Sequence, residues 1–156
     1  MYTSQKKHEE YKIYHKRIHD MVMEAAQEWQ KCTSIIFKFL ELDSTDSAHI
    51  NITFWRDEEV PPEFTPTGDY NGHWSLLRQF SSGRRPSINF NLVPLLNECE
   101  APDITAQQKV LKMKFIRATI LHEIGHALGF IHEQLRGDRD KAFKLNVEDI
   151  VTYYNT

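Results

Sequence analysis

Apolar side chains recur every three or four residues along the first part of the chain, which is the spacing of one buried helical face. They are Tyr11, Tyr14, Ile18, Met21, Val22, Ala25 and Trp29. Lys, Glu and Gln fill the other positions, and Ser4 can cap the amino end of a helix. The pattern predicts a long amphipathic helix from Ser4 to about Lys31.

The middle of the chain has the patterns of β-strands. Residues 35–39 are β-branched and aromatic, and residues 49–54 and 87–92 alternate apolar with polar side chains. Residues 73–77, in a loop-rich region, are predicted as a further short strand. All six prolines lie between Pro61 and Pro102, so both flanks are free for uninterrupted helices.

A second helical pattern occupies the last third of the chain. Its apolar positions are Val110, Met113, Ile116, Ile120, Leu121, Ile124 and Leu128. Thr105 and Gln108 have the spacing of a capping box, and Gly129 is expected to end the helix. A last short helix is predicted over residues 146–154. Together these elements predict one mixed α+β domain over residues 1–156.

Composition and charge exclude several classes of protein. With 156 residues, 40% of them hydrophobic, and a net charge of −3, the chain fits one globular domain and is not expected to bind nucleic acid or an anionic membrane. The first ten residues contain no apolar stretch, so no signal peptide is expected, and no segment has the length of a membrane-spanning helix. Only two cysteines, Cys32 and Cys99, are present, and nothing suggests that they pair.

Residues 122–133 carry the candidate chemistry. His122 and His126 are four residues apart, so their imidazoles share one helical face and can reach one metal ion. Gly129 ends the helix, and the chain can then turn so that His132 approaches from another direction. Three imidazoles leave a fourth tetrahedral position for water, which is typical of a catalytic zinc site.

Glu123 points about 100° around the helix from His122, so it is a candidate general base rather than a fourth ligand. Zinc lowers the pKa of a bound water to about 7, and the carboxylate can take its proton and pass it to a leaving amine. The segment therefore predicts peptide-bond hydrolysis with one Zn²⁺ per chain. A plain helix face is the alternative, but Gly129, the third histidine and Glu133 favour the metal site.

The five remaining histidines have no ligand spacing and are interpreted as surface or incidental residues: His8, His15, His19, His49 and His73.

Residues 122–133 resemble the extended zinc motif of the metzincins, and Phe130 with the His132-Glu133 ending is similar to the astacin family. Residues 25–37 resemble that family's first helix and the strand after it, and residues 136–140 resemble its stretch after the ligands. The resemblance implies a zincin-like fold, in which a long helix backs a twisted, mostly parallel sheet and a second helix carries the active site.

The resemblance also implies roles for single residues. It makes His122, His126 and His132 the zinc ligands and Glu123 the general base of a metalloprotease.

Glu133 would be the carboxylate that, in mature astacins, receives the N-terminus freed by propeptide removal. A surface ion pair of Glu133 with Arg136 or Arg139 is the alternative.

His73, Trp74 and Ser75 resemble the edge strand of the astacin cleft. This strand would hold a peptide or protein substrate in extended conformation through main-chain hydrogen bonds, although we expect Trp74 to pack rather than to contact substrate. The resemblance implies a secreted enzyme, and we expect a monomer.

We expect departures from the astacin pattern in both the last and the first part of the chain. The family has a methionine-containing turn beneath the zinc, but the four methionines (Met1, Met21, Met23 and Met113) all precede the motif. The family also has a zinc-site tyrosine beside that turn, whereas Tyr153 and Tyr154 are expected to pack along the last helix. We therefore expect this chain to lack the methionine turn, and also the strand that precedes the family's first helix.

Three hypotheses follow from these observations. The first is an active zinc metalloendopeptidase. The second is a zinc-binding but weakly active or inactive fragment of an astacin-like peptidase, acting at most as a binding module. The third is a non-enzymatic module with structural zinc, which requires a fourth protein ligand such as a cysteine or Tyr153.

Overall fold

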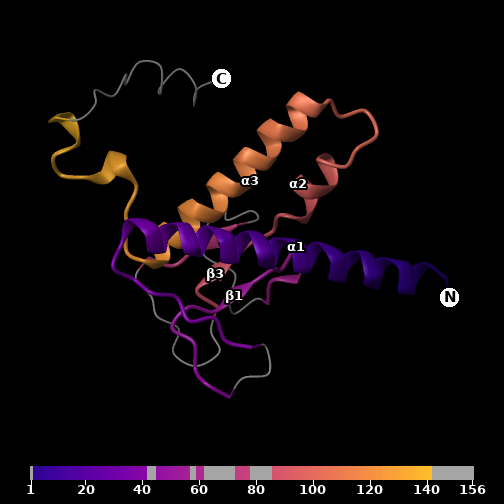
Figure 1. Ribbon diagram of the computed structural model, residues 1–156, viewed down its shortest axis with the longest axis horizontal. Coiled ribbons are helices and arrows are strands. Elements are labelled where there is room, and N and C mark those ends of the chain that lie inside the picture. Colours follow the sequence, from indigo (N-terminus) through magenta and orange to yellow (C-terminus); the bar gives the residue numbers. More distant parts are fainter. Residues whose placement is uncertain (1, 42–44, 57–58, 62–72, 78–85, 142–156) are drawn as a thin grey trace.

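The computed structural model describes residues 2–41, 45–56, 59–61, 73–77 and 86–141 (Figure 1). Its elements, in chain order, are α1 (Tyr2–Cys32), β1 (Ile52–Thr53), β2 (Trp74–Ser75), β3 (Ile88–Asn89), α2 (Val93–Glu98), α3 (Ala106–Ala127) and the 3-10 turns η3 (Glu133–Leu135) and η4 (Arg139–Lys141). The helix predicted over 146–154, with Tyr153 and Tyr154, lies outside the described residues.

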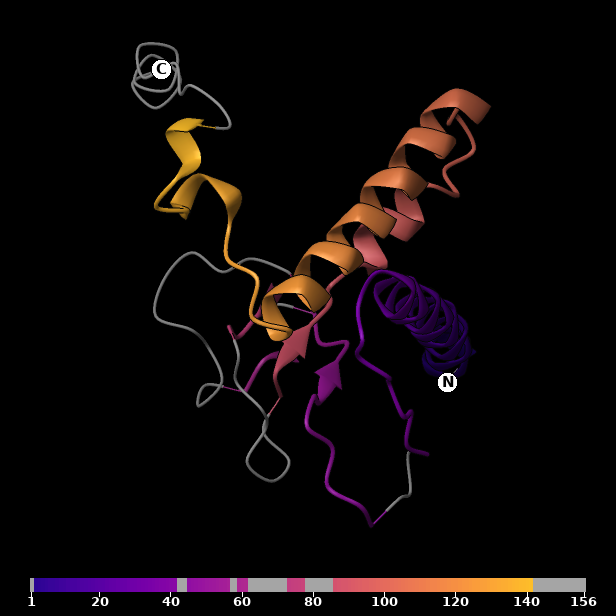
Figure 2. The ribbon, with the colours of Figure 1, turned by 60° about the vertical axis from the view of Figure 1, so that its left-hand side comes forward.

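Helix α1 forms where its periodicity predicts, and it buries the predicted apolar face. Ile18, Val22, Ala25 and Ala26 join residues of β3, α2 and α3 in one hydrophobic core. The main partner of α1 is α3. Figure 2 views α1 nearly end-on, with α3 inclined beside it.

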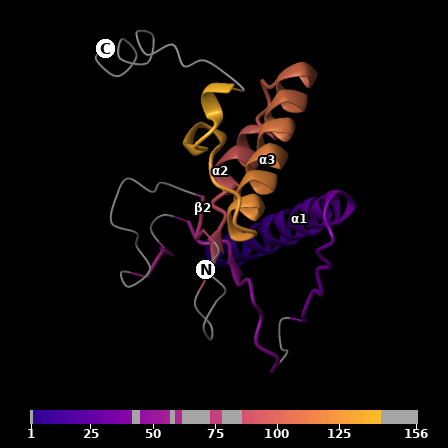
Figure 3. The ribbon, with the colours of Figure 1, turned by 90° about the vertical axis from the view of Figure 1, so that its left-hand side faces the viewer.

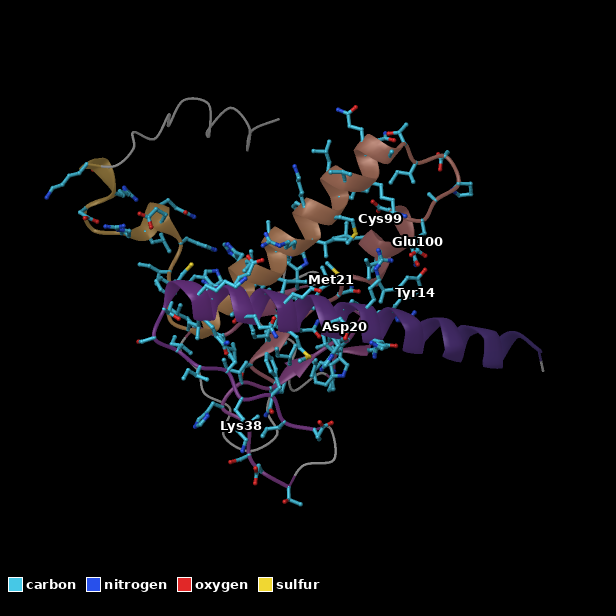
Figure 4. The ribbon with its side chains drawn as sticks, in the orientation of Figure 1. Tyr14, Asp20, Met21, Lys38, Cys99 and Glu100 are labelled. Carbon is cyan, nitrogen blue, oxygen red and sulfur yellow. The ribbon has the colours of Figure 1, made fainter. Side chains whose placement is uncertain are left out.

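Polar contacts at the rim of the core connect α1 to the end of α2. The Tyr14 hydroxyl donates to Glu100 Oε2 at 3.1 Å, and Arg17 Nη1 donates to Glu100 Oε1 at 2.5 Å. Figure 4 shows Tyr14 of α1 close to Glu100 at this junction, with Cys99 on the far side of Glu100 from Tyr14. Cys99 is buried and Cys32 is exposed, and neither forms a disulfide in this structure.

The amino end of α3 has the capping box that the sequence predicts. The Gln108 backbone N–H donates to Thr105 Oγ1 at 3.2 Å, and the Thr105 N–H donates to Gln108 Oε1 at 2.9 Å. Two backbone donors that a helix end leaves without partners are thereby satisfied. The helix consequently begins at Ala106.

The carboxyl end of α3 is a Schellman motif. The Phe130 N–H donates to the Gly125 carbonyl at 2.9 Å, and the Gly129 N–H donates to the His126 carbonyl at 2.8 Å. Gly129 has φ of 100°, a conformation that glycine adopts without a side-chain clash. After this motif the chain turns back beside α3 (Figure 3), which allows His132 to return to the helix.

Gly129→Ala should therefore lower the free energy of unfolding by about 1–2 kcal/mol, because alanine at positive φ brings Cβ against its own backbone. Urea denaturation measures this loss. Gly137→Ala is the control, since a Cβ at Gly137 meets no atom within 4 Å and its φ is not positive. Equal stability of the two variants would show that φ at Gly129 does not restrict the residue type.

The sheet among the described residues has the order β1-β3-β2. β1 pairs with β3 in parallel, with Ile52 opposite Ile88, and β2 pairs with β3 antiparallel, with Trp74 opposite Asn89. The expectation of a mostly parallel sheet is thus not confirmed here, since one pair of each kind is present. β2 and β3 both contact α3, so the sheet supports the helix that carries the histidines.

The strand predicted over residues 35–39 does not form. The segment pairs with no described strand, and the Phe37 N–H instead donates to Gln30 Oε1 of α1 at 2.6 Å. Ile36 is 87% exposed. The β propensity of these residues is real, but a strand needs a neighbouring chain to supply its hydrogen bonds.

Helix α2 is not predicted by the periodicity, because it spans only six residues. Pro94 in its first turn is the sequence signal that could have indicated it, since the fixed φ of proline suits that position. In the described part of the chain, no helix combines the length and the apolar character needed to span a membrane.

Candidate metal centre

Three histidine side chains converge where α3 meets the turn that follows it. The Nε2 atoms of His122 and His132 are 3.0 Å apart, and those of His126 and His132 are 2.9 Å apart. No cysteine or carboxylate of the described residues joins this group. The structure thus brings together the three predicted ligands and adds no fourth protein ligand within this region.

The spacing of these nitrogens fits a tetrahedral metal ion. At Zn–N distances of about 2.0–2.1 Å, two tetrahedral ligand atoms lie about 3.3–3.4 Å apart. The two observed separations are a few tenths of an ångström shorter, so small imidazole movements would admit the ion. Imidazole nitrogens are ligands that zinc prefers, and the donor set therefore fits the group that the sequence predicts.

The orientation of His126 is fixed by its second ring nitrogen. His126 Nδ1 lies 2.7 Å from the Phe130 carbonyl oxygen, to which it donates when that nitrogen carries the proton. In that tautomer Nε2 carries the free lone pair and faces the other two histidines. The Schellman motif places the Phe130 carbonyl within hydrogen-bonding distance of His126 Nδ1. The motif that ends α3 therefore also orients the His126 ring.

Partial burial lowers the pKa of His122, and the neighbouring His126, His132 and His73 lower it further because each adds positive charge when protonated. A lowered pKa favours the neutral imidazole at neutral pH. Neutral imidazole is the form that binds a metal ion.

Glu123 is buried, with 8% of its surface exposed, although it adjoins the exposed His122. Burial raises the pKa of its carboxyl group, and the nearby His126 partly opposes that rise. A carboxylate with a raised pKa is a stronger base than one in water. Burial therefore makes the Glu123 carboxylate a stronger proton acceptor than an exposed one.

An open pocket of about 350 Å³ adjoins these residues. It is lined by His73, Phe115, Ala118, Thr119, His122 and Glu123. Sequence reasoning did not select Phe115, Ala118 or Thr119, although their helical spacing from His122 places them on its face of α3.

The predicted cleft-edge residues lie at β2, one of the two edge strands of the described sheet. His73 precedes the strand and lines the pocket. Trp74 is 6% exposed and joins the buried residues, as expected from packing. Ser75 is half-buried and pairs with Ile88 of β3.

Glu133 follows the third histidine and lies in a surface ion pair. Arg136 Nη1 is 2.7 Å from Glu133 Oε1, and the same guanidinium also contacts Asp138. Arg139 instead pairs with Asp140 and donates to the Gln134 carbonyl. Of the two roles considered for Glu133, the ion pair with Arg136 is present in this structure.

Sequence reasoning assigned Trp29 to the buried face of α1 but not to the site. Its indole N–H donates to the Leu121 carbonyl at 3.1 Å, and its ring stacks on Phe130. The available signal was Gly125, because a glycine in the interior of a helix costs about 1 kcal/mol relative to alanine and usually has a packing reason.

Comparison with known proteins identifies the part of the chain that contains these ligands. Residues 106–156 match astacin, a family of peptidases. The match includes all of α3 and the turn that carries His132, so the resemblance seen in the motif is confirmed.

Individual astacin-like relatives extend the match towards the amino end. The dorsal-ventral patterning protein tolloid of Drosophila melanogaster is 29% identical over 82% of this chain and 9% of its own length. Zinc metalloproteinase nas-27 of Caenorhabditis elegans is 28% identical over 86% of this chain and 23% of its own length. Astacin-like metalloprotease toxin 4 of Loxosceles laeta is 47% identical over 23% of this chain and 32% of its own length.

The chain thus spans a third or less of each of these relatives. No solved structure matches it.

Proposed function

We propose that this chain is a zinc-dependent metalloendopeptidase of the astacin type. His122, His126 and His132 hold the metal, and Glu123 is the general base. The observation that carries the proposal is the convergence of three imidazole nitrogens beside a buried carboxylate and an open pocket. The astacin match over the same residues supports it.

The chain's own residues would perform the proton transfers. When bound, zinc supplies a Lewis acid that polarises the scissile carbonyl and acidifies water. The Glu123 carboxylate accepts a proton from the attacking water and then delivers it to the leaving amine. Burial of Glu123 keeps bulk water from competing for that proton. It also raises the pKa of the Glu123 carboxyl group, so the carboxylate binds the proton more tightly.

The substrate of this activity would be a peptide or protein in extended conformation. Among the described residues, no strand pairs with the side of β2 that faces away from β3, and this side offers main-chain groups for strand addition, while the pocket beside His122 and Glu123 receives a side chain. Trp74 supports the strand from within the core rather than contacting substrate. We further propose that the chain acts as a monomer.

Metal removal tests this proposal directly. Purified protein should contain about one zinc ion per chain by elemental analysis and should cleave a denatured protein substrate. Treatment with a chelator should abolish cleavage, and added Zn²⁺ should restore it. Addition of Mg²⁺ is the control, because a site of three imidazoles does not suit that ion.

Two outcomes would contradict the peptidase proposal. Cleavage that resists complete zinc removal would exclude the metal as its cause. Bound zinc without cleavage would favour the alternative, a zinc-binding fragment that acts as a binding module.

A further inference from the structure

We propose that Trp29 of α1 is a positioning residue for the metal centre, which holds α3 and the following turn so that the three imidazoles converge. This inference rests on the proposed function insofar as the ion is zinc. Trp29 is half-buried and lies at the carboxyl end of the apolar face of α1. It contacts the histidine-bearing segment at three places, each adjacent to a ligand or to its hydrogen-bond partner.

The first contact lies next to His122. Trp29 Nε1 donates a hydrogen bond of 3.1 Å to the carbonyl oxygen of Leu121. A carbonyl oxygen has two lone pairs, so Leu121 can accept this bond in addition to its helical one. The bond sets the rotation of α3 about its axis at the residue that precedes the first ligand.

The second contact lies between His122 and His126. A Cβ built on Gly125 would be 3.1 Å from Trp29 Cζ2, which is closer than nearly all such contacts. The glycine therefore lets the helix backbone approach the indole closely. This close approach sets the distance between α3 and α1 at the helical turn between His122 and His126.

The third contact lies in the turn that leads to His132. The Trp29 ring stacks on the Phe130 ring, with 5.1 Å between centroids and 27° between planes. Phe130 also supplies the carbonyl oxygen that lies 2.7 Å from His126 Nδ1. One stacked pair thus anchors both the turn before His132 and the hydrogen bond that orients His126.

The stacking of Trp29 on Phe130 matters because the other apolar residues of the segment that carries His132 are largely exposed. Ile131, the residue before the third ligand, is 46% exposed, and Leu135 in η3 is 63% exposed. No residue of η3 is buried. The Trp29–Phe130 stack therefore provides the apolar attachment of this segment to α1. Contacts that orient metal ligands typically change metal affinity by about 10–100-fold when removed.

The test measures zinc affinity by competition with a chromophoric chelator. We expect the dissociation constant for Zn²⁺ to rise about 10–100-fold in Trp29→Leu and about 10-fold in Phe130→Ala. Trp29→Phe keeps a ring but removes the N–H, and it should fall between Trp29→Leu and the wild type. The visible spectrum of the Co²⁺ form should change in Trp29→Leu, because the ligand geometry changes.

Ile18→Val is the matched control. Ile18 is fully buried on the same face of α1, about three turns from Trp29, so the substitution lowers stability without touching the site. Its zinc affinity should stay within about twofold of the wild type. Phe130 is 52% exposed, so Phe130→Ala provides a test in a folded protein even if Trp29→Leu fails to fold.

Wild-type zinc affinity in both Trp29→Leu and Phe130→Ala would overturn the proposal, as would an equal loss in Ile18→Val. Cleavage plays no part in this measurement. If wild type binds zinc but cleaves nothing, the peptidase proposal fails while the role of Trp29 can still be measured. If wild type binds no zinc, both proposals fail.

Discussion

Glu123→Gln should lower kcat/KM for peptide cleavage by about 10²–10⁴-fold, the usual contribution of a general base. Glutamine has nearly the shape of glutamate but cannot accept the proton of the attacking water. Because Glu123 is buried, the neutral amide should leave the free energy of unfolding unchanged or slightly raised. Steady-state kinetics and urea denaturation of the same preparation measure both quantities.

The zinc content of Glu123→Gln should equal that of the wild type, since Glu123 is not among the converging metal ligands. Glu24→Gln is the control, because Glu24 is an exposed carboxylate on α1, and it should retain full activity. If Glu123→Gln cleaves as fast as Glu24→Gln, the base is another group, or the activity belongs to a contaminant.

His126→Ala should reduce bound zinc from about one ion per chain to near zero and abolish cleavage. The substitution removes one of three ligands, and two imidazoles hold zinc weakly. It also removes the contact of Nδ1 with the Phe130 carbonyl, so the turn that carries His132 loses a restraint. Elemental analysis after dialysis against a weak chelator measures the loss.

His19→Ala is the control for the His126 experiment. His19 is an exposed histidine of α1 beside Asp20 and should not affect zinc content. Full zinc occupancy in His126→Ala would overturn the ligand assignment. A loss of zinc that was equal in both variants would indicate nonspecific binding to surface histidines.

Local signals in the sequence predicted helices α1 and α3 but not the six-residue α2. The capping box of Thr105 and Gln108 and the positive φ of Gly129 place both ends of α3 where expected, because these motifs act within one or two turns of backbone. The apolar face of α1 was also predicted from local spacing alone. Strand prediction was weaker, since residues 35–39 have β propensity without a partner strand among the described residues.

The candidate site divides in the same way. The spacing of His122, His126 and His132 follows from helix geometry and a glycine stop, so the sequence alone indicated that these three side chains converge and that Glu123 lies next to the first of them. Only the tertiary structure placed Trp29 under Gly125 and against Phe130, nearly a hundred residues further along the chain. Such contacts depend on how α1 and α3 pack, and helical periodicity indicates which face is buried but not which side chains meet there.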